Sequence, residues 1–102
     1  MLSIKTIKYE PTHSTHQRKK ATIIDVRSQL EFDQEHFPGA LHIPLEKVQD
    51  EAINIGQMPK PIVVYCRSGN RSGMAAGILA QNGINEVYNG GGLFDMLHIL
   101  NN

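Results

Sequence analysis

Two short runs of mostly β-branched apolar residues constrain the fold of this chain more than any other feature. Residues 22–26 are TIIDV and residues 62–65 are IVVY. Short runs that are apolar almost throughout are typical of parallel strands covered on both faces. Helix-like segments follow each run, and strands that alternate with helices indicate an α/β domain. We therefore predict an α/β fold with a largely parallel sheet.

The first run leads into a short predicted helix with a clear beginning. Ser28 and Glu31 have the spacing of a capping box, in which each side chain bonds the backbone N–H of the other residue. Arg27 and Glu31 are an alternative pair across the same helix start, and the sequence does not choose between these partners. The helix is expected to end before Pro38, because the residue before a proline avoids the α conformation.

Further elements are expected on both sides of the second run. Apolar spacing predicts a short strand over 40–43 and one helix over 45–55, with Gly56 just beyond its end. A helix that ends at Gly83, a strand over 86–88 and a last helix over 93–100 are expected to follow.

Two glycines and the N-terminal segment complete the predicted elements. Gly73 and Gly77 lie one turn apart in the helix that ends at Gly83. Since glycine costs about 1 kcal/mol in a helix relative to alanine, close packing on the sheet is expected to explain them. Residues 1–10 are expected to form a weak edge strand, and residues 11–20 a polar loop or a poorly formed helix.

Composition limits the remaining possibilities. The 102 residues suit one domain, and ten basic and ten acidic residues give zero formal net charge, which indicates neither a nucleic-acid nor a membrane partner. Without an apolar leader or a membrane-length apolar stretch, the cytoplasm is the expected location. One cysteine allows neither an internal disulfide nor a Cys-based zinc site. His13 and His16 have no further ligand nearby, so no metal and no cofactor is expected.

The single cysteine stands where this fold class can make a thiol reactive. Cys66 directly follows the second apolar run and opens the segment CRSGNRS, which leads into a helix. Such a loop points backbone N–H groups at one spot, and Arg67 and Arg71 flank it. These features favour the thiolate, since the cysteine pKa of about 8.5 falls to roughly 3.5–7.5 in such surroundings. A buried core thiol is the alternative interpretation, but this setting favours a nucleophile that also binds an anion.

Three segments together carry a family resemblance. The loop CRSGNRS over 66–72 is similar to the active-site loop of the rhodanese superfamily. IDVR over 24–27, EF over 31–32, HFPGA over 36–40 and IPL over 43–45 resemble its upstream signature, and VYNGGG over 87–92 resembles its closing glycine motif. The resemblance covers about residues 22–92. It implies that residues 1–102 form a single rhodanese-like three-layer domain, with helices on both sides of the sheet.

The resemblance also implies roles for the matching residues. Cys66 resembles the cysteine that takes the outer sulfur of thiosulfate, or of another sulfane donor, and holds it as a persulfide. Arg71 resembles the residue that binds the anionic donor, with Arg67 as a second candidate. Substrate binding is implied for the whole loop after the cysteine: Arg67, Ser68, Gly69, Asn70, Arg71 and Ser72. Structural roles are implied for Asp25, Arg27 and Glu31. Because no second cysteine is present, the acceptor would be cyanide or an external small-molecule or protein thiol.

Departures from the family pattern lie outside the loop. Glu35 stands where a glycine commonly precedes the family's histidine, and no tryptophan follows the glycine run. The usual leading helix is not recognisable in residues 11–20.

Alternative functions remain open at this point. Cysteine phosphatases and arsenate reductases place five residues between cysteine and arginine, whereas four separate Cys66 from Arg71, which favours attack on sulfur. A non-catalytic rhodanese-like binding or regulatory module is disfavoured, because the cysteine and both arginines are present. A persulfide relay to a dedicated protein partner cannot be separated from a general thiosulfate:thiol sulfurtransferase by sequence.

Overall fold

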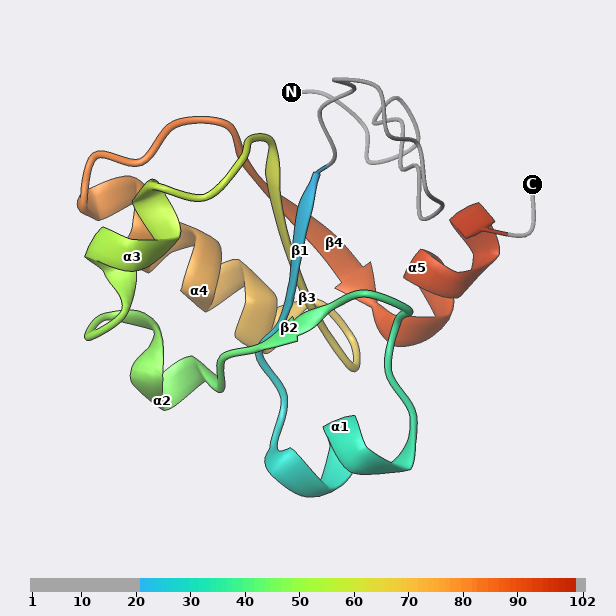
Figure 1. The fold of residues 1–102 in the computed structure, drawn as a ribbon. Coiled ribbons are helices and arrows are strands. Elements are labelled where there is room, and N and C mark those ends of the chain that lie inside the picture. Colours follow the sequence, from blue (N-terminus) through green and yellow to red (C-terminus); the bar gives the residue numbers. More distant parts are fainter. Residues whose placement is uncertain (1–20, 101–102) are drawn as a thin grey trace.

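A parallel sheet lies at the centre of the computed structural model, which describes residues 21–100 (Figure 1). Four strands form it, in the order β2-β1-β3-β4. They are β1 (Thr22–Asp25), β2 (Leu41–His42), β3 (Ile62–Cys66) and β4 (Val87–Gly92). All three neighbouring pairs are parallel. The predicted α/β fold class is therefore confirmed.

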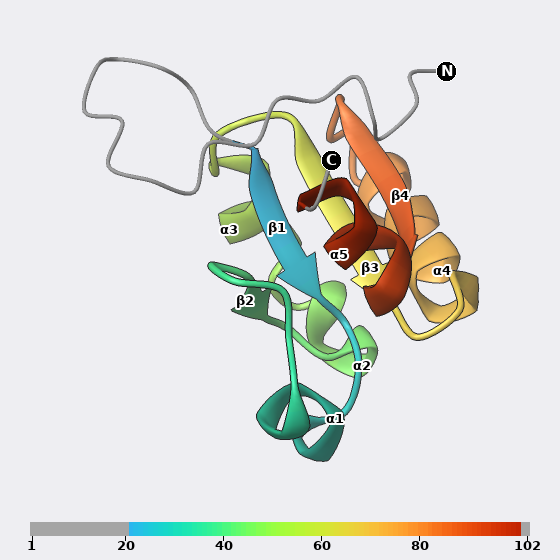
Figure 2. The ribbon, with the colours of Figure 1, turned by 90° about the vertical axis from the view of Figure 1, so that its right-hand side faces the viewer.

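Helices cover both faces of this sheet, as Figures 1 and 2 show. One face carries α4 (Asn70–Gln81) with the short helices α2 (Leu45–Val48) and α3 (Ala52–Gly56), and the other carries α5 (Leu93–Leu100). The short helix α1 (Gln29–Gln34) lies beyond the carboxyl ends of the strands. The described residues thus form the three layers that the sequence predicted.

Successive strand residues point to opposite faces, and this alternation divides the core in two. One cluster of buried side chains lies between the sheet and α4; it includes Ile24, Val64, Cys66, Ala75 and Leu79. The other lies on the α5 side; it includes Ile23, Val63, Tyr65, Leu93 and Met96. Cys66 and Tyr65 therefore point to opposite sides of the same strand.

The beginning of α1 is a capping box, as predicted. The Glu31 N–H donates to Ser28 Oγ at 3.2 Å, and the Ser28 N–H donates to Glu31 Oε1 at 3.0 Å. The alternative pair of Arg27 with Glu31 is not formed, since the Arg27 guanidinium bonds Asp25. The helix ends at Gln34, before Pro38.

The prediction of one helix over 45–55 is wrong. Two short helices, α2 and α3, replace it, and Gly56 is the last residue of α3 rather than the residue beyond its end. Glu51 interrupts the helical backbone with a ψ of 5°, far from the helical value of about −42°. At this break the side-chain amides of Gln49 and Asn82 bond each other at 3.3 and 3.2 Å, which ties the end of α2 to the end of α4.

The remaining expectations differ from the structure in smaller ways. The strand predicted over 40–43 is confined to Leu41–His42, and the strand predicted over 86–88 continues through the glycine run to Gly92. Close packing on the sheet does not explain Gly77, which is exposed and would place a Cβ with no atom within 4 Å. A Cβ at Gly73 would meet the Asn89 side chain of β4 at 3.4 Å.

Some predictions lie outside the described residues. These are the edge strand over 1–10 and the polar loop over 11–20. Within residues 21–100, no helix combines the length and the apolar character that a membrane crossing needs.

Candidate functional site

The carboxyl edge of the sheet, between β1 and β3, is where a ligand site is expected in this topology. The chain adds β2 on one side of β1 and then returns to add β3 on the other side of β1. The direction in which strands are added therefore reverses at this point. Open parallel sheets bind ligands in the crevice outside such a switch point. Arg27 follows β1 here, and Cys66 ends β3.

The sulfur of Cys66 lies inside the loop that follows it. The residue is 1% exposed, and its Sγ accepts hydrogen bonds from the Gly69 N–H at 3.0 Å and the Ser72 N–H at 3.4 Å. Ser72 Oγ lies 3.3 Å from the same sulfur. Gly69 turns the chain with a φ of +101° and is the N-cap of α4, so the helix begins directly at the sulfur.

These contacts lower the pKa of the Cys66 thiol below its ordinary value. Burial by itself raises that pKa, because it disfavours the charged form. The hydrogen bonds from the Ser72 hydroxyl and backbone, and then from the Ser68 and Gly69 backbone, outweigh burial. The loop therefore favours the thiolate, in the direction that the sequence predicted.

Asn89 of β4 forms hydrogen bonds to the Cys66 loop from the neighbouring strand. Its Nδ2 donates to the Gly69 carbonyl at 3.0 Å, while its Oδ1 accepts from the Ser72 hydroxyl at 2.6 Å and from the Gly91 N–H at 2.9 Å. Sequence reasoning quoted Asn89 as part of the glycine motif and missed this contact with the loop. The pairing of β4 with β3, which places Asn89 beside Val64, creates it.

Arg71 forms an ion pair with Glu31. Two nitrogens of its guanidinium donate to the two carboxylate oxygens of Glu31, at 2.8 and 3.1 Å. The hydrogen bond from Arg71 holds the pKa of Glu31 at about 2, although partial burial works against it. Glu31 in turn raises the pKa of Arg71, and the Cys66 thiolate adds to that rise. Glu31 thus caps α1 and orients the loop arginine at the same time.

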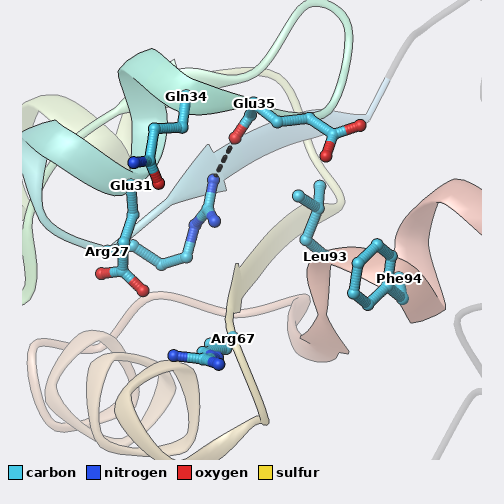
Figure 3. Close-up of a pocket in the computed structure, with 7 residues that line it drawn as sticks. All are labelled: Arg27, Glu31, Gln34, Glu35, Arg67, Leu93 and Phe94. Carbon is cyan, nitrogen blue, oxygen red and sulfur yellow. Dashed lines mark hydrogen bonds between the residues drawn. The ribbon is translucent and has the colours of Figure 1, made fainter.

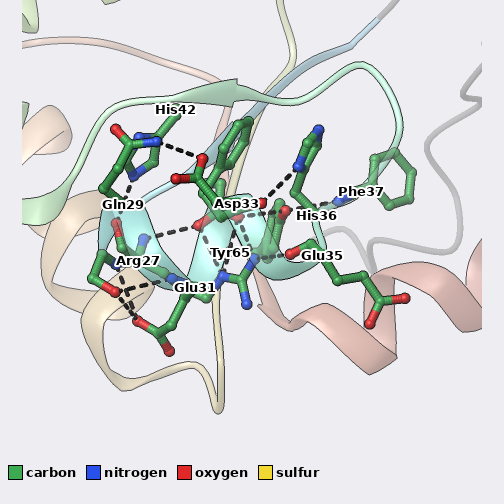
Figure 4. A network of polar contacts seen from close by, with 12 residues as sticks. Arg27, Gln29, Glu31, Asp33, Glu35, His36, Phe37, His42 and Tyr65 are labelled. Carbon is green, nitrogen blue, oxygen red and sulfur yellow. Dashed lines mark hydrogen bonds and ion pairs between the residues drawn. The ribbon is translucent and has the colours of Figure 1, made fainter.

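A buried polar network lies under the site (Figure 4). Asp25, fully buried, accepts from the backbone N–H of Arg27 at 2.8 Å, from Arg27 Nη2 at 2.7 Å and from the Tyr65 hydroxyl at 2.7 Å. Arg27 Nη2 also donates to the Glu35 carbonyl at 2.6 Å. Burial, more than any other influence, raises the pKa of Tyr65 and keeps its hydroxyl a donor. Asp25 and Arg27, for which the resemblance implied structural roles, thus bond each other and the neighbouring Tyr65 and Glu35.

The two histidines near this network pack their rings against Phe32. His42 Nε2 lies 2.7 Å from the Arg27 carbonyl, His36 Nδ1 lies 2.8 Å from the Phe32 carbonyl, and both rings stack on Phe32. Among the residues that the structure describes, no group of three potential metal ligands comes together.

A cleft of about 350 Å³ opens beside the loop (Figure 3). Arg27, Arg67, Leu93 and Phe94 line one part of it, from the ends of β1 and β3 and the beginning of α5. The α1 side contributes Glu31 and the two residues that end this segment, Gln34 and Glu35. Arg67, which follows Cys66 in the sequence, is the residue of the loop that lines the cleft, whereas Cys66 itself does not line it. Of the side chains that α1 and α5 contribute to this cleft, Glu31 was among the site residues expected from the sequence, whereas Gln34, Leu93 and Phe94 were not.

Comparisons with known proteins find relatives that are similar to this chain in sequence and in fold. The thiosulfate sulfurtransferase PspE of Escherichia coli is 40% identical over 74 residues, which are 72% of this chain and 71% of PspE. The protein YqhL of Bacillus subtilis is 42% identical over 71 residues, which are 70% of this chain and 56% of YqhL, so the chain spans a little over half of that relative. A solved structure, rhodanese with anions from E. coli, has a TM-score of 0.67 at 39% identity and covers 74% of this chain and 89% of its own.

The sequence pattern of one family extends over most of the chain. The description of that family is "Rhodanese-like domain", and its match covers residues 12–95. This range includes all four strands and the Cys66 loop. The chain belongs to the rhodanese-like domain family.

Proposed function

We propose that the protein is a sulfurtransferase and that Cys66 carries the transferred sulfur as a persulfide. The observation that carries this proposal is the convergence of two backbone N–H groups and one hydroxyl on Cys66 Sγ, within 3.0–3.4 Å. That convergence lowers the thiol pKa and so supplies a nucleophile without a separate general base. The similarity to PspE, which is named a thiosulfate sulfurtransferase, supports thiosulfate as a donor.

The proposed reaction has two displacement steps at sulfur. In the first step, the Cys66 thiolate attacks the outer sulfur of thiosulfate. A new S–S bond forms, the bond to the sulfonate sulfur breaks, and sulfite leaves with the electron pair. In the second step, an acceptor thiolate or cyanide attacks the outer sulfur of the persulfide, and Cys66 leaves as a thiolate. No redox cofactor is needed, because each step exchanges one bond to sulfur for another.

The rest of the loop is proposed to bind the donor. The backbone N–H groups of Gly69 and Ser72 already point at the sulfur and would stabilise negative charge there. Arg71 is held next to the loop by Glu31 and keeps further N–H groups for the sulfonate oxygens. Ser68 and Asn70, both exposed, complete the predicted binding loop.

Intact-mass measurement after incubation with thiosulfate tests this proposal. We expect the mass to rise by one sulfur atom and to return to the starting value on addition of cyanide or dithiothreitol. Cys66→Ser should remain folded, as judged by circular dichroism, and take up no sulfur. Sulfur transfer by Cys66→Ser, or hydrolysis of p-nitrophenyl phosphate by the wild type in place of sulfur transfer, would contradict the proposal.

A further inference from the structure

The neighbours of Asn89 fix the orientation of its side-chain amide. Its Oδ1 accepts a hydrogen bond from the Gly91 N–H at 2.9 Å, and its Nδ2 donates to the Gly69 carbonyl at 3.0 Å. A backbone N–H can only donate and a carbonyl can only accept, so these two bonds identify the oxygen and the nitrogen of the amide. The same Oδ1 lies 2.6 Å from Ser72 Oγ, and the Ser72 hydroxyl is therefore the donor in that contact.

This bond decides which side of the Ser72 hydroxyl faces the sulfur. A hydroxyl has one proton and two lone pairs, and the proton of Ser72 points at Asn89. Cys66 Sγ lies 3.3 Å from the same oxygen and therefore faces a lone pair. An oxygen lone pair repels a negatively charged sulfur, whereas a neutral sulfur tolerates it. The Asn89 contact thus disfavours the thiolate, while the N–H groups of Gly69 and Ser72 favour it.

The charge on Cys66 Sγ changes during the proposed reaction. Before sulfur uptake, Sγ is a thiolate. After the attack on thiosulfate, Sγ is bonded to the outer sulfur, and that outer sulfur carries the negative charge. The donor arrives from solvent, whereas Ser72 is fully buried, so we expect the added sulfur on the solvent side of Sγ. The lone pair of Ser72 Oγ then faces a neutral sulfur, and its bond to Asn89 is undisturbed.

We propose that Asn89 is a positioning residue that favours the sulfur-loaded protein, because it holds the Ser72 hydroxyl in the orientation that suits a neutral Cys66 Sγ. This inference rests on the proposed sulfur transfer and concerns how firmly the sulfur is held. Ser72 can donate to the thiolate only by giving up its bond to Asn89, so every release of sulfur breaks that bond. Asn89 thus shifts the loading equilibrium of Cys66 toward the persulfide.

The equilibrium of the loading step provides the first test. The protein is equilibrated with thiosulfate and sulfite at known ratios, at a pH above the alkylation midpoint of Cys66. Iodoacetamide then caps the thiolate and the persulfide, and intact mass gives the fraction that carries sulfur. In Ser72→Ala, the substitution Asn89→Ala removes only the bonds to Gly69 and Gly91. We expect Asn89→Ala to lower the loading constant about fivefold more in the wild type than in Ser72→Ala, as for one neutral hydrogen bond.

The pH dependence of alkylation separates this inference from the proposed function, because it needs no sulfur transfer. Without Asn89, the Ser72 hydroxyl is free to donate to the thiolate. We therefore expect Asn89→Ala to lower the alkylation midpoint of Cys66 by about 0.5–1 pH unit more in the wild type than in Ser72→Ala. A purely structural role of Asn89 predicts the same shift in both backgrounds, because the loop is loosened equally.

Asn54→Ala is the matched control. Asn54 is an exposed asparagine of α3 that bonds Glu51, and its substitution should change neither the loading constant nor the midpoint. Should Asn89→Ala fail to fold, as judged by circular dichroism, Asn89→Ser gives the same comparison, because its oxygen lies one bond nearer the backbone and no longer reaches Ser72. Equal effects of Asn89→Ala in the two backgrounds refute the role of Asn89, whereas absence of sulfur uptake in the wild type refutes only the proposed function.

Discussion

The Ser72 hydroxyl has one proton and two acceptors within reach. Asn89 Oδ1 lies 2.6 Å from it and Cys66 Sγ lies 3.3 Å away. While Cys66 is a thiol, its S–H donates to Ser72 Oγ and the Ser72 proton stays with Asn89. When Cys66 ionises, the sulfur can only accept, so the Ser72 hydroxyl can bond it only by giving up its bond to Asn89. We therefore expect ionisation of the thiol to exchange one hydrogen bond of Ser72 for another.

Removal of this hydroxyl should raise the pKa of Cys66. We expect Ser72→Ala to move the midpoint of iodoacetamide alkylation upward by roughly one pH unit, since a hydrogen bond to a charged group contributes about 1.5–3 kcal/mol and one unit corresponds to about 1.4 kcal/mol. Alkylation rates measured against pH give the midpoint. Ser68→Ala is the matched control, because the Ser68 hydroxyl has no hydrogen bond to the sulfur. Equal midpoints in the two variants would show that the Ser72 hydroxyl does not stabilise the thiolate.

At the scale of elements, the end of β4 and the beginning of the loop approach each other very closely. A Cβ on Gly92 would lie 2.1 Å from the Arg67 carbonyl oxygen, far inside contact distance. Gly92 pairs with Cys66, so the same approach fixes the start of the loop against the sheet. Only a residue without a side chain allows it.

Two glycine substitutions should therefore have opposite effects. Gly92→Ala should lower the free energy of unfolding by about 1–3 kcal/mol, because backbone must move, and should slow sulfur uptake by displacing the loop. Gly77→Ala, on the open face of α4, should raise that free energy by about 1 kcal/mol, because alanine favours the helix and meets no neighbour. Urea denaturation measures both changes. A Gly92→Ala protein as stable as the wild type would refute the close approach.

The elements that sequence predicted well are those with a complete local signal. The two β-branched runs became β1 and β3, Ser28 capped α1, and α5 has the predicted bounds of Leu93–Leu100. The division of 45–55 into α2 and α3 was not predictable in this way. No glycine or proline marks residues 49–51, and the tie from Gln49 to Asn82 spans 33 positions.

In the candidate site, too, the features with a local signal were predictable and those made by distant contacts were not. The loop after β3 and the lowered pKa of Cys66 followed from the order strand, loop, helix, which is a local pattern. The partner of Arg71 lies 40 positions away, and the brace from Asn89 depends on which strand pairs with β3. Such contacts are consequences of strand order, which no local pattern contains. Three expectations stay predictions: the extent of the single domain over residues 1–102, the cytoplasmic location and the roles of the site residues.

For the whole molecule, the Glu31–Arg71 ion pair predicts a specific response to acid. The folded pKa of Glu31 is about 2, below its ordinary value of 4.5. A carboxylate with a depressed folded pKa stabilises the protein above its ordinary pKa, and this contribution is lost as pH falls from about 4.5 toward 2. Because both side chains are partly exposed, we expect a contribution of about 1 kcal/mol.

Glu31→Gln should remove that part of the acid response. Glutamine also completes a capping box, so α1 should remain, while the ion pair is lost. We expect the variant to lose less stability than the wild type between pH 4.5 and 2, as measured by urea denaturation at several pH values. Glu46→Gln, at a carboxylate with no ion pair within residues 21–100, is the control and should follow the wild type. Parallel pH profiles for the wild type and Glu31→Gln would contradict the prediction.

The polar and aromatic contacts that hold α1 affect how readily this helix unfolds locally. The helix has no buried residue, and its ties to the neighbouring segments are polar or aromatic: Glu31 to Arg71, the Glu35 carbonyl to Arg27, and Phe32 stacked on His42. A segment with few buried apolar contacts unfolds locally at lower cost than the strands beneath it. Dissolved salt screens the exposed Glu31–Arg71 ion pair, so we expect higher ionic strength to favour local unfolding of α1. The amide hydrogens of α1 should then exchange with solvent faster than those of β1 and β3.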